Sequence, residues 1–284
     1  MRIAIQGEPG SFSHEAALRA LPEATIFPCA VSAEVFAAVK EGRVDAAVIP
    51  IENSLAGSVL EHYDLLLAED VAIESESLLR IRHNLIAMPG TTMEQIERVY
   101  SHPVALAQCR RFLAQHPRME AVPFYDTAGS VKHLLEQHDA QAAGIASAQA
   151  ARHYGGEVLA AGIEDNPENF TRFFVIRKRG LVTADPRADK VSLAFTVENR
   201  PGTLVAALEV FAGQGTNLTR IESRPVQGKP WQYVFYADYQ LSSPQSADAA
   251  LKLLAGHCSM VKELGRYRAA VSDRRSAVRE AGDQ

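Results

Sequence analysis

The sequence predicts an α/β fold in two parts. Over residues 1–180, short apolar strands alternate with helical patterns, which is typical of parallel sheets with helices on their faces. After a charged segment at 178–190 that contains Gly and Pro, the order changes to a compact βαββαβ pattern, the split βαβ arrangement. We therefore predict a first region at 1–180, a second domain at 190–268 and a polar tail at 269–284.

Two groups of strands in the first region favour two lobes with a cleft between them, one at 1–78 plus 160–180 and the other at 79–159. The predicted strands are the runs 3–6, 45–50, 71–79, 82–88, 98–100, 120–124, 142–146, 157–162 and 170–177. Residues that favour helix starts and ends stand between several of these strands. They are Ser13, Ser32, Thr92 with Gln95, Pro103, Asp126, Ser147 and the pair Gly155-Gly156.

Alternation of apolar residues with small or polar ones marks the first strand of the second domain. Val191, Leu193, Phe195 and Val197 alternate with small or polar residues, which indicates a half-buried strand. The other expected elements are a helix after Pro201-Gly202, strands at 217–224 and 232–239 joined by a turn at 227–230, a helix starting at Ser243-Pro244, and a strand at 260–267.

Composition and charge exclude several classes of protein. The chain has 29 Lys and Arg against 34 Asp and Glu, a formal net charge of −5, and 47% of its residues are hydrophobic. A mildly acidic chain without basic blocks argues against nucleic acid as a partner, and its apolar content excludes wholesale disorder. No apolar run reaches the roughly 18 residues of a membrane span. The N-terminus lacks the pattern of a signal peptide, so we expect a cytoplasmic protein.

The cysteines and histidines do not form the spacings of a metal or redox site. Cys29, Cys109 and Cys258 are far apart and form no CxxC pair, so we expect three buried thiols in a reducing compartment. The nine histidines include no HExxH motif. No phosphate-binding GxxxxGK[ST] or GxGxxG motif is present either. We therefore predict no metal and no cofactor.

Five loops that follow predicted strands carry the polar residues from which a site could be built. In parallel sheets, ligands bind beyond the carboxyl ends of the strands. The loops are 6–13, 50–59, 101–109, 125–130 and 169–176. Their glycines, hydroxyls and amides precede helix starts, which favour anions, and Arg172 suits a carboxylate because its guanidinium forms two parallel hydrogen bonds. From the residues alone, these loops predict a pocket for a small anion.

Plainer explanations remain for each of these residues. Asn53, Ser54 and Asp126 are also good helix caps, and Gln108 fits an exposed helix position. The polar residues around Thr171 and Arg172 fit a sheet edge equally well. The histidines near the loops, His62, His83 and His102, are weak candidates for an acid or base.

Seven segments, taken in order, are similar to the prephenate dehydratase family. They are QGEPGSFSHEAA, VIPIENSLAGSV, SHPVALAQC, DTAGSV, GIASAQAARHYGGEVLAAGIEDNPENFTRFFVI, PGTLVAAL and IESRP. The resemblance implies a two-lobed catalytic region like type II periplasmic binding proteins, followed by an ACT regulatory domain. It implies a carbon–oxygen lyase that removes water and carbon dioxide from prephenate to give phenylpyruvate, in L-phenylalanine biosynthesis, with no cofactor.

The resemblance also implies roles for individual residues. The catalytic group comprises Thr171, Glu52, Asn53, Ser101 and Gln108, and the substrate-binding group comprises Arg172, Phe173, Ser54 and Thr127. The Thr171 hydroxyl would donate a hydrogen bond to the leaving oxygen. It would not transfer its proton completely, because it is too weak an acid to serve as a complete general acid. Glu52 is either a proton donor with a raised pKa or a structural partner of a neighbouring amide.

For the ACT domain the resemblance implies L-phenylalanine as effector and a homodimer or dimer of dimers. The implied effector residues are Gly202, Thr203, Leu204, Val205, Asn217, Leu218, Glu222, Ser223, Arg224 and Pro225. The family usually has Ala where this chain has Thr203, and a larger apolar residue where it has Gly156. Because the chain begins with the first catalytic strand, we expect no fused chorismate mutase.

Two alternatives stay open. The same chemistry on arogenate would yield phenylalanine directly, and the loop at 126–131 is where discrimination is expected. A non-catalytic reading is a sensor of small anions or amino acids, in which the ACT domain serves a partner protein or only dimerisation.

Overall fold

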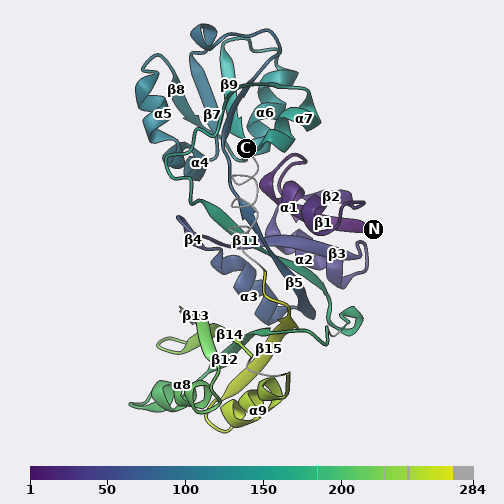
Figure 1. The fold of residues 1–284 in the computed structure, drawn as a ribbon, viewed down its shortest axis with the longest axis vertical. Helices are drawn as coiled ribbons and strands as arrows, with labels where there is room; N and C mark the ends of the chain where they lie inside the picture. Colours follow the sequence, from purple (N-terminus) through teal and green to yellow (C-terminus); the bar gives the residue numbers. More distant parts are fainter. Residues whose placement is uncertain (184, 227, 242–243, 271–284) are drawn as a thin grey trace, which may run out of the picture. The chain divides into compact units, whose positions relative to one another are not determined.

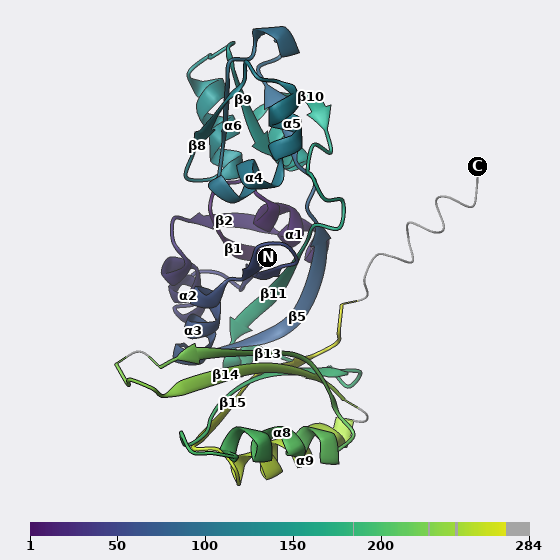
Figure 2. The ribbon, with the colours of Figure 1, turned by 90° about the vertical axis from the view of Figure 1, so that its left-hand side faces the viewer.

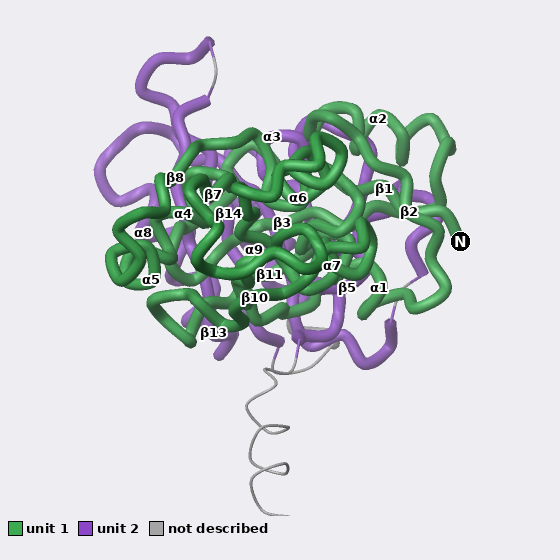
Figure 3. Tube along the Cα trace, turned by 90° about the horizontal axis from the view of Figure 1, so that it is seen from above, with its two compact units in different colours: residues 1–62, 77–173 green, residues 63–76, 174–284 purple. Residues whose placement is uncertain are grey.

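The computed structural model describes residues 1–183, 185–226, 228–241 and 244–270. It is a mixed α/β fold (Figure 1). The chain divides into two compact units, Met1–His62 with Ser77–Phe173, and Tyr63–Glu76 with Phe174–Gln284 (Figure 3). We call them unit 1 and unit 2.

Two long strands, β5 (Val71–Arg80) and β11 (Phe170–Lys178), each run from one unit into the other. Segments 63–76 and 174–180, which we expected in the first region, belong to unit 2. One reason is that β5 pairs in parallel with β15 (Met260–Tyr267), where Ile73 lies opposite Gly265. The predicted boundaries at 78, 160 and 180 therefore stay predictions of sequence domains, while the compact units divide elsewhere.

The first sheet of unit 1 has the strand order β11-β3-β1-β2. The strands β1 (Arg2–Gln6), β2 (Thr25–Cys29) and β3 (Ala46–Asn53) are parallel, and the short β4 (Gly57–Ser58) pairs antiparallel with β3. The helices are α1 (Phe12–Ala20), α2 (Ser32–Lys40) and α3 (Leu60–Ala68), of which α3 continues into unit 2. Consecutive residues of β1 are fully buried, which is typical of parallel strands covered on both faces.

The second sheet of unit 1 has the order β10-β6-β9-β7-β8. Its strands are β6 (Asn84–Ala87), β7 (Arg98–Ser101), β8 (Glu120–Pro123), β9 (Ala142–Ala146) and β10 (Glu157–Ala161). The prediction of parallel sheets is wrong for one of them, because β6 is antiparallel to both of its neighbours, β9 and β10. Such mixed sheets occur where an antiparallel strand joins a parallel core, as β7, β8 and β9 form here.

The helices beside the second sheet are α4 (Pro103–Gln108), α5 (Arg110–Gln115), α6 (Thr127–Glu136) and α7 (Ala148–Tyr154). Three expected signals are confirmed: Asp126 and Ser147 cap α6 and α7, and Pro103 opens α4. Gly155 ends α7 with a positive φ of 77°. No helix in the described ranges is long and apolar enough to cross a membrane.

Other helix starts differ from the prediction. Ser11, two residues before the expected Ser13, caps α1, because its hydroxyl accepts from the backbone N–H of His14. Ser32 is the first residue of α2 rather than its cap. The capping signal at Thr92 precedes only a short 3₁₀ turn, η1 (Met93–Gln95), in which Gln95 Oε1 accepts from the Thr92 N–H at 2.7 Å.

Unit 2 contains the βαββαβ order that the sequence predicts. Its elements are β12 (Lys190–Thr196), α8 (Thr203–Gly213), β13 (Asn217–Pro225), β14 (Tyr233–Gln240), α9 (Pro244–Ala255) and β15, after a 3₁₀ turn, η2 (Arg179–Leu181). The sheet order is β13-β14-β12-β15, and both helices lie on one of its faces (Figure 2). Ser243, Gln227 and the tail from 271 lie outside the described residues.

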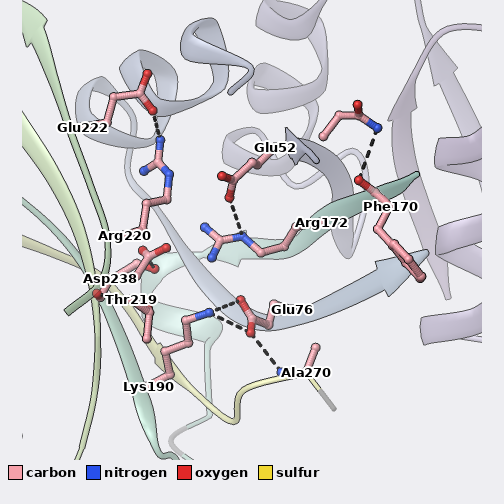
Figure 4. Close-up of polar contacts among 12 residues, drawn as sticks. Glu52, Glu76, Phe170, Arg172, Lys190, Thr219, Arg220, Glu222, Asp238 and Ala270 are labelled. Carbon is pink, nitrogen blue, oxygen red and sulfur yellow. Dashed lines mark hydrogen bonds and ion pairs between the residues drawn. The ribbon is translucent and has the colours of Figure 1, made fainter. Parts of the chain in front are cut away.

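The core of unit 2 joins its sheet to its helices. Leu193 and Phe195 of β12 are fully buried, and they belong to one cluster with Phe211 of α8 and Leu254 of α9. A buried ion pair adds a polar contact, because Lys190 Nζ lies 2.9 Å from Glu76 Oε1 and the N–H of Ala270 donates to the same oxygen (Figure 4). Such a pair is costly to break, since removal of one partner leaves a buried charge.

The expectation of three buried thiols is only partly right. Cys29 and Cys109 are buried, whereas Cys258 is half-buried, because it lies in the short loop between α9 and β15.

Gly265 is required by a close contact with β5. A Cβ built on Gly265 would lie 2.5 Å from the carbonyl oxygen of Ile73. Overpacking of this kind typically costs about 1–3 kcal/mol, because the backbone must move. We expect Gly265→Ala to lower the free energy of unfolding by about 2 kcal/mol, measured from the urea unfolding curve. Gly213→Ala is the matched control, since no atom lies within 4 Å of a Cβ there; equal losses in both variants would contradict the assignment.

Candidate active site

A cavity of about 740 Å³ lies in unit 1. Its walls come from the segments that follow β1, β3 and β7 and from the starts of α6 and β11. Hydroxyls, amides, imidazoles and carboxylates line it together with the rings of Phe12 and Phe173. A mainly apolar hollow with a few polar groups, of roughly 300–1,000 Å³, is typical of sites for small molecules.

The structure brings together five of the nine residues predicted for catalysis and substrate binding. Those that line the cavity are Asn53, Gln108, Thr127, Thr171 and Phe173. The other four, Glu52, Ser54, Ser101 and Arg172, are not among its lining residues in the described part of unit 1.

Strand geometry explains the positions of Glu52 and Arg172. Successive side chains of a strand point to opposite faces, so Thr171 and Phe173 face the cavity while Arg172 between them faces away. Arg172 Nε lies 3.8 Å from Glu52 Oε2, and the two side chains point toward one another (Figure 4). Arg172 and Glu52 thus form an ion pair outside the cavity lining, and their roles as substrate ligand and proton donor stay predictions.

The two serines hold loops in place. Ser54 Oγ donates to the carbonyl oxygen of Glu168 and accepts from the N–H of Phe170, both at 3.0 Å, so it joins the loop after β3 to the start of β11. Ser101 is fully buried, and its hydroxyl donates to the carbonyl oxygen of Ile145 at 2.6 Å. Both serines thus have structural contacts, and their roles at the substrate stay predictions.

Asn53 is the centre of a polar cluster at the end of β3. Its Oδ1 accepts from the backbone N–H groups of Leu55 and Ala56, at 3.0 and 2.8 Å. Its Nδ2 donates to Thr171 Oγ1 at 3.0 Å and to Asn169 Oδ1 at 2.8 Å. Because the Thr171 hydroxyl oxygen accepts from Asn53, its own proton is left to donate elsewhere.

Gln108 continues the cluster from α4. Its Oε1 accepts from Asn169 Nδ2 at 2.9 Å and lies 2.8 Å from His83 Nε2. Sequence reasoning missed Asn169 as a site residue and gave His83 little weight. Asn169 is the first residue of the loop 169–176 that it singled out, and His83 lies in the predicted strand 82–88, but neither has a residue pattern that predicts a contact with Gln108.

The charges that line the cavity are negative. Its lining residues include the carboxylates of Glu8 and Asp126 and, in the part of the chain that the structure describes, no Lys or Arg. Glu8 accepts from the Tyr125 hydroxyl at 3.0 Å and pairs with Lys132 at 3.2 Å. Burial raises the pKa of Asp126, and Glu8 adds to the shift. Gly7 permits the approach of Asp126, because a Cβ at this positive-φ residue would lie 2.6 Å from the Asp126 carboxylate.

The other two histidines near the loops have structural contacts. His102 lines the cavity and caps α4 by accepting from the N–H of Val104 at 3.3 Å. His62 is fully buried outside the cavity lining, between the Pro50 carbonyl and the Ser32 hydroxyl. Among the residues that the structure describes, no three His, Cys, Asp or Glu side chains gather as ligands of a metal ion.

The residues predicted for the effector lie in unit 2, at the start of α8 and along β13. They are Gly202, Thr203, Leu204, Val205, Asn217, Leu218, Glu222, Ser223, Arg224 and Pro225. Leu204 and Leu218 pack against the same core, which brings the two segments onto one cluster. Thr203 Oγ1 donates to the carbonyl oxygen of Glu198 at 2.6 Å. Arg224 pairs with Asp64 at 2.6 Å, and Glu222 pairs with Arg220 (Figure 4). Their role in effector binding stays a prediction.

Relatives are similar to the chain over nearly its whole length. It is 39% identical over 278 residues to arogenate dehydratase/prephenate dehydratase 2, chloroplastic, of Arabidopsis thaliana, which covers 94% of this chain and 72% of that protein. Among solved structures, prephenate dehydratase from Arthrobacter aurescens in complex with L-Phe has a TM-score of 0.86 at 32% identity, covering 99% of this chain and 98% of that one.

A second solved structure has a different description. GqqA, described as a novel type of quorum quenching acylase, has a TM-score of 0.88 at 34% identity, covering 97% of this chain and all of that one (100%).

The family models divide the chain as the motifs do. Residues 191–239 match the family described as ACT domain. Residues 3–180, which hold the cavity and its polar cluster, match the family described as Prephenate dehydratase. The chain therefore belongs to the prephenate dehydratase family, with an ACT domain after the catalytic region.

Proposed function

We propose that this chain converts prephenate to phenylpyruvate in the cavity of unit 1. In this reaction the ring C–O bond breaks, and the leaving hydroxyl group takes up one proton from solvent water and departs as water. The C–C bond to the ring carboxylate also breaks, and its electron pair makes the ring aromatic as carbon dioxide departs. The protein must place a donor at the leaving oxygen and orient the ring.

The hydrogen bond from Asn53 Nδ2 to Thr171 Oγ1 carries this proposal. It directs the Thr171 proton away from Asn53, and Thr171 lines the cavity. The hydroxyl then stabilises the negative charge that develops on the leaving oxygen, as a donor in an oxyanion hole does. A carboxylate of the substrate has one helix start to approach, α1 at Ser11, because the start of α6 is capped by the Asp126 carboxylate.

Incubation of the purified protein with prephenate tests the proposal. Phenylpyruvate, measured by its absorbance in alkali, is expected to accumulate with multiple turnovers. Tight binding of prephenate without turnover would favour the sensor alternative instead.

The two carboxylates in the cavity lining favour arogenate as a second substrate. Arogenate carries an ammonium group where prephenate has a keto group, and Glu8 and Asp126 would attract it. We expect Asp126→Asn to lower kcat/KM for arogenate about fivefold relative to prephenate, since a partly exposed charge pair contributes about 1 kcal/mol. Asparagine caps helices as well as aspartate does, so α6 is preserved. Asp248→Asn in unit 2 is the control, and an unchanged substrate ratio in Asp126→Asn would contradict this preference.

The candidate nucleophiles of this chain do not favour an acylase activity like the one described for GqqA. Acyl transfer needs a nucleophile activated by a neighbouring base. The hydrogen-bonded pair Ser32 and His62 is buried and does not line the cavity. Cys29 lines it, but burial raises the pKa of this thiol and so disfavours the reactive thiolate.

We further propose that L-phenylalanine regulates the enzyme through its ACT domain, as a homodimer or dimer of dimers in the cytoplasm. The support is the ACT match and the position of β13 at the end of the sheet of unit 2, with Ile221 45% exposed. A strand at a sheet edge is suited to pairing with a second copy. Light scattering coupled to gel filtration, with and without L-phenylalanine, tests the oligomeric state. The initial rate of phenylpyruvate formation under the same two conditions tests the regulation.

A further inference from the structure

The orientation of the Asn53 amide follows from two backbone groups. The N–H groups of Leu55 and Ala56 both approach the same Asn53 side-chain atom, and a backbone N–H can only donate. That atom is therefore the oxygen, and the nitrogen faces Asn169. Since Asn53 Nδ2 donates, its partner 2.8 Å away must be Asn169 Oδ1.

The orientations of Asn169 and Gln108 determine which ring nitrogen of His83 carries a hydrogen. With its oxygen facing Asn53, Asn169 presents its nitrogen to Gln108, so the Gln108 atom 2.9 Å away is the acceptor Oε1. His83 Nε2 lies 2.8 Å from that acceptor and must carry a hydrogen. Backbone amides at Leu55 and Ala56 thus dictate the protonation of a ring nitrogen four hydrogen bonds away.

The other ring nitrogen of His83 has no proton to give. Burial lowers the pKa of His83, so the ring is neutral at pH 7 with its hydrogen on Nε2. Nδ1 is buried and has no hydrogen-bond partner among the described residues. The charged group facing His83 is Glu164, whose carboxylate accepts from the His83 backbone N–H at 2.9 Å, and the ring edge packs against Phe12. Toward the described residues, the neutral ring therefore acts through its Nε2–H donor, while the Nδ1 lone pair has no donor to accept from.

His83 therefore acts on Gln108. With two donors on Oε1, the Gln108 carboxamide presents its NH₂ group to the cavity that it lines. The NH₂ group has no partner among the described residues and is left to donate to a ligand oxygen.

We propose that His83 is a positioning residue: as a neutral Nε2–H donor it holds the Gln108 NH₂ group toward the substrate, and it transfers no proton in the reaction. The inference rests on the proposed function, because its kinetic effect is expressed in prephenate turnover.

Four variants separate positioning from the other roles of a buried histidine. His83→Leu removes the donor, and we expect a fall in kcat of about tenfold, the effect of one neutral hydrogen bond. The glutamine side-chain nitrogen reaches the position of histidine Nε2, so His83→Gln should recover kcat to within about threefold of wild type. Gln108→Leu and the double variant His83→Leu/Gln108→Leu complete a double-mutant cycle.

The expected cycle is strongly non-additive: once Gln108 is leucine, His83→Leu causes no further loss of kcat. The pH profile of kcat in His83→Gln is expected to match that of wild type. His116→Leu is the matched control, since His116 bonds its own helix at Phe112 and does not line the cavity; its kcat should not change.

Three results would overturn the proposal. An additive cycle would mean that His83 does not act through Gln108. Loss of one limb of the pH profile in His83→Gln would make His83 an acid or base. Equal losses of kcat and of thermal midpoint in both His83 variants would indicate a purely structural role.

A second measurement does not depend on turnover. In two-dimensional ¹⁵N–¹H spectra of the wild-type protein, the His83 ring, assigned by its absence in His83→Gln, is expected to show the neutral Nε2–H form from pH 7 to 8. A hydrogen on Nδ1, or titration in this range, would refute the inference. A wild-type protein that shows the expected ring but does not turn over prephenate would instead refute the proposed function alone.

Discussion

Replacement of Thr171 by alanine is expected to lower kcat for prephenate by about 10²- to 10³-fold, the usual effect of removing one donor to a developing oxyanion. Thr171 is buried to 8% exposure at the start of β11 and lines the cavity. Its oxygen accepts from Asn53 at 3.0 Å, so its proton is free for the leaving oxygen. Since the donor is needed most in the transition state, KM should change little.

Two further variants at Thr171 distinguish the hydroxyl from the shape of the side chain. Thr171→Val keeps the branched shape but removes the donor, so steady-state kinetics should show a loss like that of alanine. Thr171→Ser keeps the donor and should retain most of the activity. Full activity in Thr171→Val would show that another group assists departure of the oxygen.

The elements with clear local signals are those that could be predicted from the sequence. Asp126 and Ser147 cap their helices because a short acceptor side chain satisfies free N–H groups within the same turn. This contact needs no knowledge of the rest of the fold. By contrast, β2 was missed: its Thr25–Cys29 segment is short, contains Pro28 and forms the edge of its sheet, so its pairing with β1 decides its structure.

The candidate site could likewise be predicted only in those features that depend on local sequence. The loops that form the cavity were predicted, because ligands bind beyond the carboxyl ends of parallel strands, here β1 and β3 of the first sheet and β7 of the second. Which side chains converge depends on details that a motif does not contain. Thr171 and Arg172 are neighbours in one motif, yet the alternation of β11 sends them to opposite faces. Ser101 ends its strand as expected but bonds inward to Ile145.

The residues that were missed depend on long-range contacts. Asn169 and Gln108 are 61 positions apart, and His83 and Gln108 are 25 apart. Each is an ordinary turn, helix or core residue when its own segment is considered alone. Their joint role appears only once the fold places the two amides and the imidazole in one chain of hydrogen bonds.

Asn53→Asp is expected to be the most damaging conservative change in the molecule, with a loss of kcat of about 10³-fold or more. A carboxylate still accepts from the N–H groups of Leu55 and Ala56, but it has no hydrogen to give. It faces Thr171 Oγ1, Asn169 Oδ1 and the carbonyl oxygen of Phe170, which all accept from the Asn53 amide in the wild-type protein. The Thr171 proton then turns toward the carboxylate and away from the substrate, and an unpaired acceptor on Asn169 costs about 1–3 kcal/mol.

The pH dependence of kcat in Asn53→Asp tests whether Asn53 acts as a hydrogen-bond donor. A protonated aspartic acid recovers one O–H donor, so kcat of Asn53→Asp should rise as pH falls toward the pKa of the new carboxyl group. Asn53→Leu has no proton to gain, and its residual kcat should follow the wild-type profile. Asn166→Asp is the matched control, because the side chain of Asn166 only accepts, from the N–H of Glu168 at 2.9 Å. If Asn53→Asp lost no more activity than Asn166→Asp, the donor role of Asn53 toward Thr171 would be wrong.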